Sequence, residues 1–311
     1  METNGAASRS MCSTRSYLST ETTLVSRVTA ASCAAIAVVQ GSRQRRNLGA
    51  RRASPGSQIS LPDGREVKVL ANREEVASAL AAEVANYAGA AIAEKGAFSI
   101  CVPGSFGPAD GQAFAGAQLI GESIAKLGEQ GPDFDKWHVF FAGERLDGQE
   151  SYLLAKKLWL DACKIPSAQV HPVPQDMPAE GAAAQYTAEI CMQDETVLMD
   201  SDEGLPAVDL LLLDMADDGT VGRLRPDSSE VDEAGTGKLV LPVEDDDAEA
   251  AVVSPDFMNA ARAAVIVATG DGAATSISKA LADASPSCPA SLVRTPKMTW
   301  LLDSASAASL E

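Results

Sequence analysis

The chain has few of the residues and patterns on which many functions depend. Only two of its 311 residues are histidine. No Gly-x-Gly-x-x-Gly pattern opens a predicted helix after a strand, which argues against a dinucleotide-dependent oxidoreductase. No uninterrupted apolar run reaches the ~18 residues that a membrane span requires, so we predict no span. The six cysteines show neither CxxC nor metal-like spacing, and we predict reduced thiols and no metal or other cofactor.

Basic charge is scarce except at one end of the chain. Residues 1–56 carry eight arginines and two acidic residues, a net charge of +6, whereas the remainder has a net charge of −24. A surface this acidic repels the phosphates of nucleic acids, and we therefore predict no nucleic-acid partner. The apolar share of 46% is enough to bury a core, which places the chain among soluble globular proteins.

The first 56 residues have the composition of an organellar targeting leader. They are rich in Ser, Thr, Ala and Arg and poor in acids, and they end in paired arginines before Pro55 and Gly56. An apolar stretch at 30–39 follows Arg27, as in the core of a signal peptide. A signal followed by a transit peptide suits a plastid with extra membranes, whereas a disordered tail is the alternative. We predict plastid (chloroplast) localisation, a leader over 1–56 and one α/β domain over 57–311.

Short apolar strands alternate with longer helical patterns through the rest of the chain. Asn72 and Glu75 form a capping box at the start of the first helix. Such alternation implies parallel strands joined by right-handed crossovers. The predicted fold class is α/β, an open, mostly parallel sheet flanked by helices on both faces. The predicted strands are 66–70, 98–102, 138–142, 169–173, 209–213, 250–253, 264–268 and 298–302. The predicted helices are 73–95, 111–127, 149–163, 182–192 and 270–284, and 227–249 is predicted to be an acidic loop.

Two loops at the ends of predicted strands mark the candidate site. The apolar run 209–213 breaks into the polar turn 214–220, at the strand end where open α/β sheets bind ligands. The loop 103–108 follows another strand, and its Gly104 and Ser105 fit an anion cradle at a helix start or an ordinary strand-to-helix turn. The sequence therefore predicts the functional site at the edge of the sheet formed by the carboxyl ends of these strands.

Several phrases in the chain follow one family pattern. Residues 137–145 read WHVFFAGER, against the family's WxxVxxFFxDER. Residues 209–226 read DLLLLDMADDGTVGRLRP, against DLxLLGMGxDGHTASLFP, and the chain closes on WLLD at 300–303. The sequence thus resembles the 6-phosphogluconolactonase family, relatives of glucosamine-6-phosphate isomerase. The resemblance implies metal-free hydrolysis of 6-phosphoglucono-lactone in the oxidative pentose phosphate pathway.

The residue that the resemblance assigns as general base is changed. The motif keeps Asp218 and Gly219, but Thr220 stands where the family has histidine. A threonine hydroxyl has no pKa near neutrality and cannot take a proton from water in that role. Glu144 is the best remaining candidate base, although a carboxylate that only pairs with Arg145 is the alternative. His138 and His171 stand at positions that match the family's framework, and we expect structural rather than catalytic roles for both.

Further differences alter the charge of the site. Asp214 and Asp217 add carboxylates where the family motif has none. Arg223 and Arg225 stand at positions where the family motif has small hydroxyl-bearing and aromatic residues. With Arg145 they are candidates to replace phosphate-binding residues that the family has and this chain lacks.

Two hypotheses remain open from the sequence. One is a divergent but working lactonase that binds a phosphosugar or small anion. The other is a catalytically inactive relative that acts as a binding or scaffold subunit, with a protein partner in a plastid assembly. The catalytic candidates are Glu144, Asp218 and Thr220. The candidate phosphate-binding residues are Gly104, Ser105, Arg145, Gly219, Arg223 and Arg225.

Overall fold

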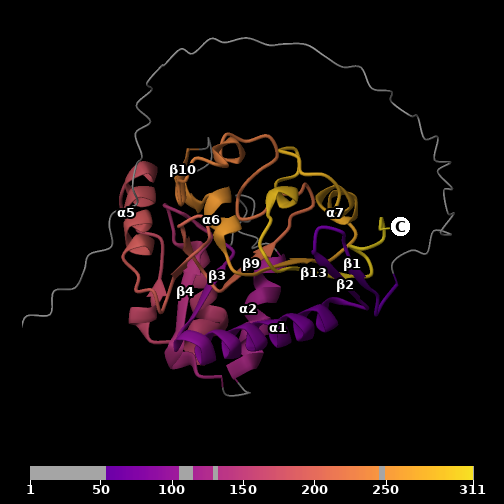
Figure 1. The fold of residues 1–311 in the computed structure, drawn as a ribbon, viewed down its shortest axis with the longest axis horizontal. Helices are drawn as coiled ribbons and strands as arrows, with labels where there is room; N and C mark the ends of the chain where they lie inside the picture. The colour runs from indigo at the N-terminus through magenta and orange to yellow at the C-terminus, as the bar shows by residue number, and fades with distance from the viewer. Residues whose placement is uncertain (1–53, 105–114, 129–131, 245–248, 311) are drawn as a thin grey trace, which may run out of the picture. The chain divides into compact units, whose positions relative to one another are not determined.

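The computed structural model describes residues 54–104, 115–128, 132–244 and 249–310. An eight-stranded sheet runs through this part of the chain in the order β1-β2-β13-β12-β9-β3-β4-β6 (Figure 1). Only the edge pair β1–β2 is antiparallel, and every other neighbouring pair in this sheet is parallel. Its strands are β1 (Gln58–Ser60), β2 (Glu66–Leu70), β3 (Phe98–Val102), β4 (Trp137–Phe141), β6 (Val170–His171), β9 (Leu210–Asp214), β12 (Ala264–Ala268) and β13 (Met298–Asp303).

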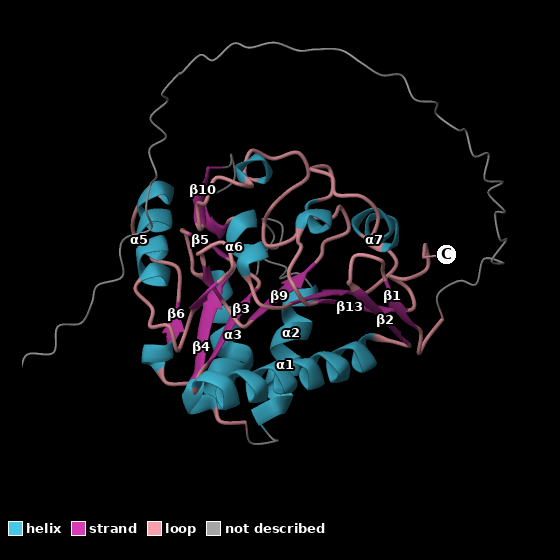
Figure 2. Ribbon diagram, viewed as in Figure 1, coloured by secondary structure: helices cyan, strands magenta, loops and turns pink. Residues whose placement is uncertain are grey.

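Helices cover both faces of this sheet. Helices α1 (Arg73–Lys95) and α2 (Ala115–Gly128) pack against each other and against β3, β9 and β13. Helices α6 (Pro255–Ala260) and α7 (Ala274–Ala280) lie on the other side of the strands (Figure 2). Because both faces are covered, every residue of β3, β9, β12 and β13 is buried. The predicted α/β fold class is confirmed.

The first helix begins and ends as its sequence predicts. The Asn72 side chain accepts a hydrogen bond from the Glu75 N–H, and the Glu75 carboxylate accepts one from the Ala71 N–H. At the other end, Gly96 has φ +87°, a left-handed conformation that glycine adopts without steric cost. These caps fix the helix between β2 and β3.

Helix α1 is also the one helix in the described ranges that is long and apolar enough to cross a membrane. Length and composition alone support that assignment, and a helix buried in a protein core meets the same criteria. Val76, Leu80 and Val84 of this helix are fully buried within the main core. Its packing against the sheet is that of a core helix.

A short second sheet lies beside the main one, and one of its three strands falls where the sequence analysis predicted a loop. Strand β10 (Val240–Glu244) pairs antiparallel with β11 (Glu249–Val253), and β11 pairs with β5 (Gly143–Arg145). The prediction of an acidic loop over 227–249 is therefore wrong for β10. Val240, Leu241 and Val243 of β10 are buried, and the strand packs against α5 (Ala179–Cys191). This packing stabilises the strand despite the charged residues that follow it.

Several of the remaining elements differ in extent from the predicted ones, and the strand predicted over 169–173 is limited to β6. The helix predicted from 270 is limited to α7, because Asp303 accepts hydrogen bonds from the Gly270 N–H and holds residues 270–273 in a turn. The predicted helix over 149–163 is present as α3 (Glu150–Ala155), a π-helical turn (Lys156–Leu160) and α4 (Asp161–Cys163). The described part also contains the two-stranded ladder β7 (Met199–Asp200) and β8 (Pro206–Ala207).

Candidate functional site

The candidate site lies at the carboxyl end of β9, the strand on which the sheet order turns. From β3 the chain adds β4 and β6 on one side of the sheet, and it then returns to add β9, β12 and β13 on the other. Ligands of open α/β sheets bind beyond the strand ends at such a switch point. The loop that follows β9 lies there, and the first residues after β3, Pro103 and Gly104, are buried.

A hairpin formed by residues 215–224 folds over this edge. Backbone bridges join Met215 to Val221 and Val221 to Leu224. Gly219 closes the first turn with φ +95°, and a Cβ at this position would lie 2.8 Å from the Cys288 sulfur. Glycine is therefore required at 219 for its backbone conformation and for the close contact with Cys288.

The second turn of the hairpin holds an arginine in an unfavourable backbone conformation. Gly222 and Arg223 have φ +53° and +67°, the pattern of a two-residue hairpin turn with both central residues left-handed. A residue other than glycine pays about 1–2 kcal/mol for this conformation. The surrounding structure holds Arg223 in place despite that cost, which is a common feature of binding sites.

Thr220 is enclosed between these two turns. Its backbone N–H donates to Asp218 Oδ1 at 2.9 Å, and its side chain is only 9% exposed. No hydrogen-bond partner for its hydroxyl is found in the described part of the chain. A buried hydroxyl without a partner costs roughly 1–3 kcal/mol, so this position is not optimised for stability.

Asp214 ends β9 with its carboxylate buried against the start of α2. The side chain is 7% exposed, and a Cβ added to Gly116 would lie 3.0 Å from Asp214 Oδ2 and in steric conflict with its Cβ. Burial raises the pKa of Asp214 to about 6, although hydrogen bonds from its own backbone and from Ala117 oppose that shift. Burial thus destabilises the ionised form of Asp214, and its pKa lies near neutrality.

Gly116 is a contributor to the site that the sequence analysis missed. Glycine inside a helix costs up to about 1 kcal/mol relative to alanine, so it needs a reason. The reason is the close approach of α2 to Asp214 on β9. A glycine within the predicted helix 111–127 is the only sequence signal for this contact.

The other two aspartates of the motif are exposed. Asp217 lies against Gly272 in the turn before α7, and its carbonyl accepts a hydrogen bond from the Ser276 hydroxyl. Asp218 accepts the Thr220 N–H, which shapes the turn. The structure therefore brings Asp218, Gly219 and Thr220 together as one compact turn.

Glu144 lies within the fold and supports a helix start. Its carboxylate is 1% exposed and accepts backbone N–H bonds from Arg145, Ser151 and Tyr152 at 2.9–3.2 Å. Ser151 and Tyr152 belong to the first turn of α3, whose N–H groups have no partner within the helix. Burial raises the pKa of Glu144, and these N–H bonds act against the rise. The carboxylate takes the place of a helix cap.

Three arginines gather where β5 meets the hairpin. Arg145 forms a two-point ion pair with Asp147 at 2.7 and 3.0 Å. Burial lowers the pKa of Arg223 to about 10, and the like charges of Arg225 and Arg145 lower it further, while Glu230 and Asp147 oppose them. We call Arg145, Arg223 and Arg225 the arginine cluster. The charges of Arg145 and Arg225 thus act on Arg223.

The loop after β3 is described only at its beginning. Pro103 and Gly104 are buried and follow β3 toward the site. Ser105, which was predicted to bind phosphate, lies outside the described residues, as do 106–114. The predicted anion cradle therefore stays a prediction.

Both histidines lie in a polar chain at the edge of the sheet. His138 Nδ1 lies 3.3 Å from His171 Nε2, and His171 Nδ1 lies 2.9 Å from Glu189. The His171 ring stacks on Phe140 with 4.5 Å between centroids. Burial, with smaller effects from His171 and Lys95, lowers the pKa of His138 to about 4. These contacts account for both imidazoles within the β4–β6 edge.

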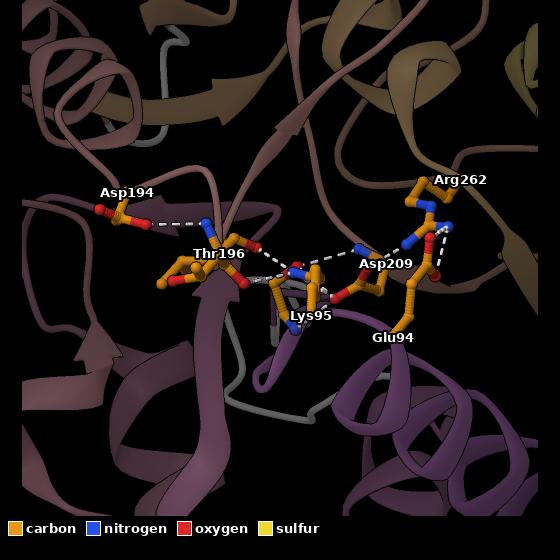
Figure 3. A network of polar contacts seen from close by, with 8 residues as sticks. Glu94, Lys95, Asp194, Thr196, Asp209 and Arg262 are labelled. Atoms are coloured by element: carbon orange, nitrogen blue, oxygen red, sulfur yellow. Dashed lines mark hydrogen bonds and ion pairs between the residues drawn. The ribbon is translucent and has the colours of Figure 1, made fainter.

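A different polar network lies at the amino end of β9 (Figure 3). Asp209 is 4% exposed and pairs with Lys95 and Arg262, each at 3.0 Å. It also accepts bonds from the Ser99 N–H and hydroxyl. Arg262 continues to Glu94 at 2.8 Å. Every charged group in this network has a counterpart of opposite sign.

Within the ranges that the structure describes, no group of three or more His, Cys, Asp or Glu side chains could hold a metal ion. Cys101, Cys163 and Cys288 are buried as thiols, and burial raises the pKa of each.

The sheet order, the hairpin at its switch point and the arginine cluster define an α/β protein with a candidate anion site on the hairpin that follows β9. The sequence profile of the glucosamine-6-phosphate isomerase/6-phosphogluconolactonase family matches residues 71–301. The chain belongs to this family.

Relatives with known names agree with that assignment. A protein of Oryza sativa subsp. indica, named probable 6-phosphogluconolactonase 4, chloroplastic, is 33% identical over 184 residues, 54% of this chain and 55% of the relative. The chain thus spans about half the length of this rice relative. Human 6-phosphogluconolactonase is 30% identical over 202 residues, 61% of this chain and 75% of the relative.

Solved structures share the fold at low sequence identity. The 6-phosphogluconolactonase of Trypanosoma brucei has a TM-score of 0.64 and 18% identity, over 79% of this chain and 98% of that one. The 6-phosphogluconolactonase of Thermotoga maritima has a TM-score of 0.60 and 20% identity, over 76% and 98%. At this identity the likeness supports the fold alone.

Proposed function

We propose that this protein binds a sugar phosphate, or a small anion of similar shape, without hydrolysing 6-phosphoglucono-lactone. The observation that carries the proposal is Thr220, a buried hydroxyl in the motif place that the family fills with histidine. Lactone hydrolysis needs a group that accepts a proton from water near neutral pH. Thr220 offers no such group.

The other candidate bases support the same proposal. Glu144 is buried and its oxygens accept N–H groups that start α3, which favours a structural role for this carboxylate. The Asp218 carboxylate shapes the turn around Thr220. His138 and His171 bond to each other at the β4–β6 edge, away from the carboxyl end of β9.

Anion binding is supported by the arginine cluster. Arg223 combines a left-handed backbone, partial burial and two neighbouring positive charges. An oxyanion bound here would relieve the repulsion among Arg145, Arg223 and Arg225. Arginine is suited to this task because its planar guanidinium donates two parallel hydrogen bonds to a phosphate.

A second candidate function is lactonase turnover with Asp214 as the general base. The observation in its favour is the pKa of Asp214, raised to about 6 by burial, because a base works best when its pKa lies near the working pH. Against it, the carboxylate is almost wholly buried and bonded to Ala117. We therefore place this candidate second.

The cellular setting of the proposed function is a plastid. The rice relatives are named as chloroplastic, and residues 1–56 have the composition of a targeting leader. Within the plastid we propose that 57–311 act as one domain, either alone with its ligand or as a binding subunit of a larger assembly.

The arginine cluster is tested by calorimetric titration with 6-phosphogluconate. Arg223→Gly removes the guanidinium and also relieves the left-handed backbone, so the fold should be kept. We expect this variant to bind at least about tenfold more weakly than the wild type, since one charge-assisted hydrogen bond contributes roughly 1.5–3 kcal/mol.

Asp227→Gly is the matched control for that titration. Asp227 also has a positive φ, +56°, and is exposed, so glycine relieves the same backbone conformation without removing an arginine. Its affinity should equal that of the wild type. Equal affinity of Arg223→Gly and the wild type would refute the arginine cluster as the ligand site.

A further inference from the structure

The Asp147 carboxylate contacts Arg145 in the way that an anionic ligand would. Its Oδ1 accepts a hydrogen bond from Arg145 Nε at 3.0 Å, and its Oδ2 accepts one from Arg145 Nη2 at 2.7 Å. Arginine binds a phosphate through the same two parallel N–H···O bonds from one guanidinium. Asp147 thus occupies one side of the Arg145 guanidinium as a phosphate would.

The charge of Asp147 also acts on Arg223, a second member of the arginine cluster. Burial and the like charges of Arg225 and Arg145 lower the pKa of Arg223, and the charges of Glu230 and Asp147 oppose this. The pKa of Asp147 is lowered, chiefly by its hydrogen bonds with Arg145 and further by the charge of Arg223. A negative charge beside Arg145 therefore also stabilises the charge of Arg223.

The segment around Asp147 is held by contacts other than this ion pair. Asp147 lies in the turn between β5 and α3, and its side chain is 57% exposed, against 17% for Arg145. The start of α3 is held instead by Glu144, which accepts the Ser151 and Tyr152 N–H groups. An ion pair at the surface contributes little to stability, because water solvates both charges when they separate. Asp147 can therefore leave Arg145 for water while the fold is kept.

We propose that Asp147 is an internal competitor of the anionic ligand: it occupies the Nε–Nη2 side of Arg145, and a phosphate monoester binds there only when Asp147 moves away. This inference rests on the proposed anion-binding function and concerns the regulation of that same site. A carboxylate attached to the chain is always present beside Arg145, so it lowers the affinity for any external anion. Loss of Asp147 should therefore strengthen binding, whereas loss of a residue that only supports the site would not.

The test measures the affinity of the full chain for glucose 6-phosphate by calorimetric titration at pH 7.5. We expect Asp147→Asn to bind this phosphate monoester at least about fivefold more tightly than the wild type, because a neutral amide competes less for the guanidinium. Circular dichroism checks that the variant is folded. Asp147→Ala, which removes both oxygens, takes its place if the asparagine variant does not fold.

Asp133→Asn is the matched control for the change in net charge. Asp133 is exposed and pairs with Lys136 at 3.1 Å, and the whole of β4 separates it from β5 along the chain. Its affinity should agree with that of the wild type within about twofold, because water and salt screen charges at this separation.

The outcomes separate this proposal from the proposed function. A gain of less than about fivefold in the folded Asp147 variant, or an equal gain in Asp133→Asn, would overturn this proposal alone. If neither the wild type nor any variant bound glucose 6-phosphate, the proposed function would be refuted as well.

Discussion

The two ends of β9 carry buried aspartates in opposite surroundings. Asp209, at the amino end, lies between Lys95 and Arg262 and accepts two bonds from Ser99. Asp214, at the carboxyl end, has backbone N–H groups of Asp214 and Ala117 to offset its burial, and its pKa rises to about 6. At the amino end the buried charge of Asp209 is therefore paired with charges of opposite sign. At the carboxyl end the buried charge of Asp214 retains an electrostatic cost.

This contrast separates a structural polar network from a site. Natural proteins break the rules of local stability mainly where function requires it. The carboxyl end gathers several such departures: the buried Asp214, the Thr220 hydroxyl without a partner among the described residues, and the left-handed Arg223. Among the described residues around Asp209, the polar groups are paired and stabilise the fold.

The largest expected effect belongs to the amino end. Asp209→Ala should lower the free energy of unfolding by about 3–5 kcal/mol, because it leaves the buried Lys95 ammonium without its carboxylate. Urea unfolding measures this change. Asp202→Ala, at an exposed turn, should change stability by less than about 0.5 kcal/mol. If Asp209→Ala lowers the free energy of unfolding by less than about 1 kcal/mol, the contrast between the two ends of β9 is refuted.

The next effect concerns Asp214 and depends on pH. Burial raises its pKa from 3.8 to about 6, so the folded state binds a proton more readily than the unfolded state. The stability of the wild type relative to Asp214→Asn should therefore fall as the pH rises from about 4 to about 6 and stay constant above. A rise of the pKa from 3.8 to about 6 corresponds to roughly 3 kcal/mol.

Urea unfolding of the wild type and Asp214→Asn at pH 4 and pH 8 checks this dependence. The pKa of Asp214 is governed by burial and by the N–H groups of Asp214 and Ala117. Comparison with the asparagine variant removes the contributions of other titrating groups. If the stability difference between the wild type and Asp214→Asn is the same at both pH values, the Asp214 carboxylate does not carry an uncompensated buried charge.

A smaller effect is expected at Thr220. Thr220→Val removes the buried hydroxyl, which has no partner in the described structure, and should raise the free energy of unfolding by about 1 kcal/mol. Thr220→Ser keeps the hydroxyl and serves as the comparison. If valine lowers stability instead, the hydroxyl has a partner such as an ordered water, and Thr220 belongs with the compensated groups.

Most of the fold could be predicted from the sequence because its signals are local. The capping box of Asn72 and Glu75 and the apolar runs of β3 and β9 each depend on neighbouring residues, and the structure confirms them. Strand β10 was missed because the charges beside it suggested a loop. Its stability comes from pairing with β11 and from α5, which local composition does not reveal.

The candidate site residues stay predictions, and their surroundings could not be predicted from the sequence. The family pattern pointed to Thr220 and to the three arginines, and in the structure the charges of Arg145 and Arg225 act on Arg223. The role of Glu144 as a cap for α3 was not predicted, since nothing in its own segment shows which N–H groups it meets. The burial of Asp214 depends on Gly116, about a hundred residues earlier in the sequence.

Hydrolysis of 6-phosphoglucono-lactone by the full chain tests the central claim most directly. We expect the wild type to hydrolyse the lactone no faster than buffer. Thr220→His should stay equally inactive, because this enclosed position has no room for an imidazole without strain. A wild-type turnover above about 1 s⁻¹, an ordinary rate for an enzyme, would contradict the account.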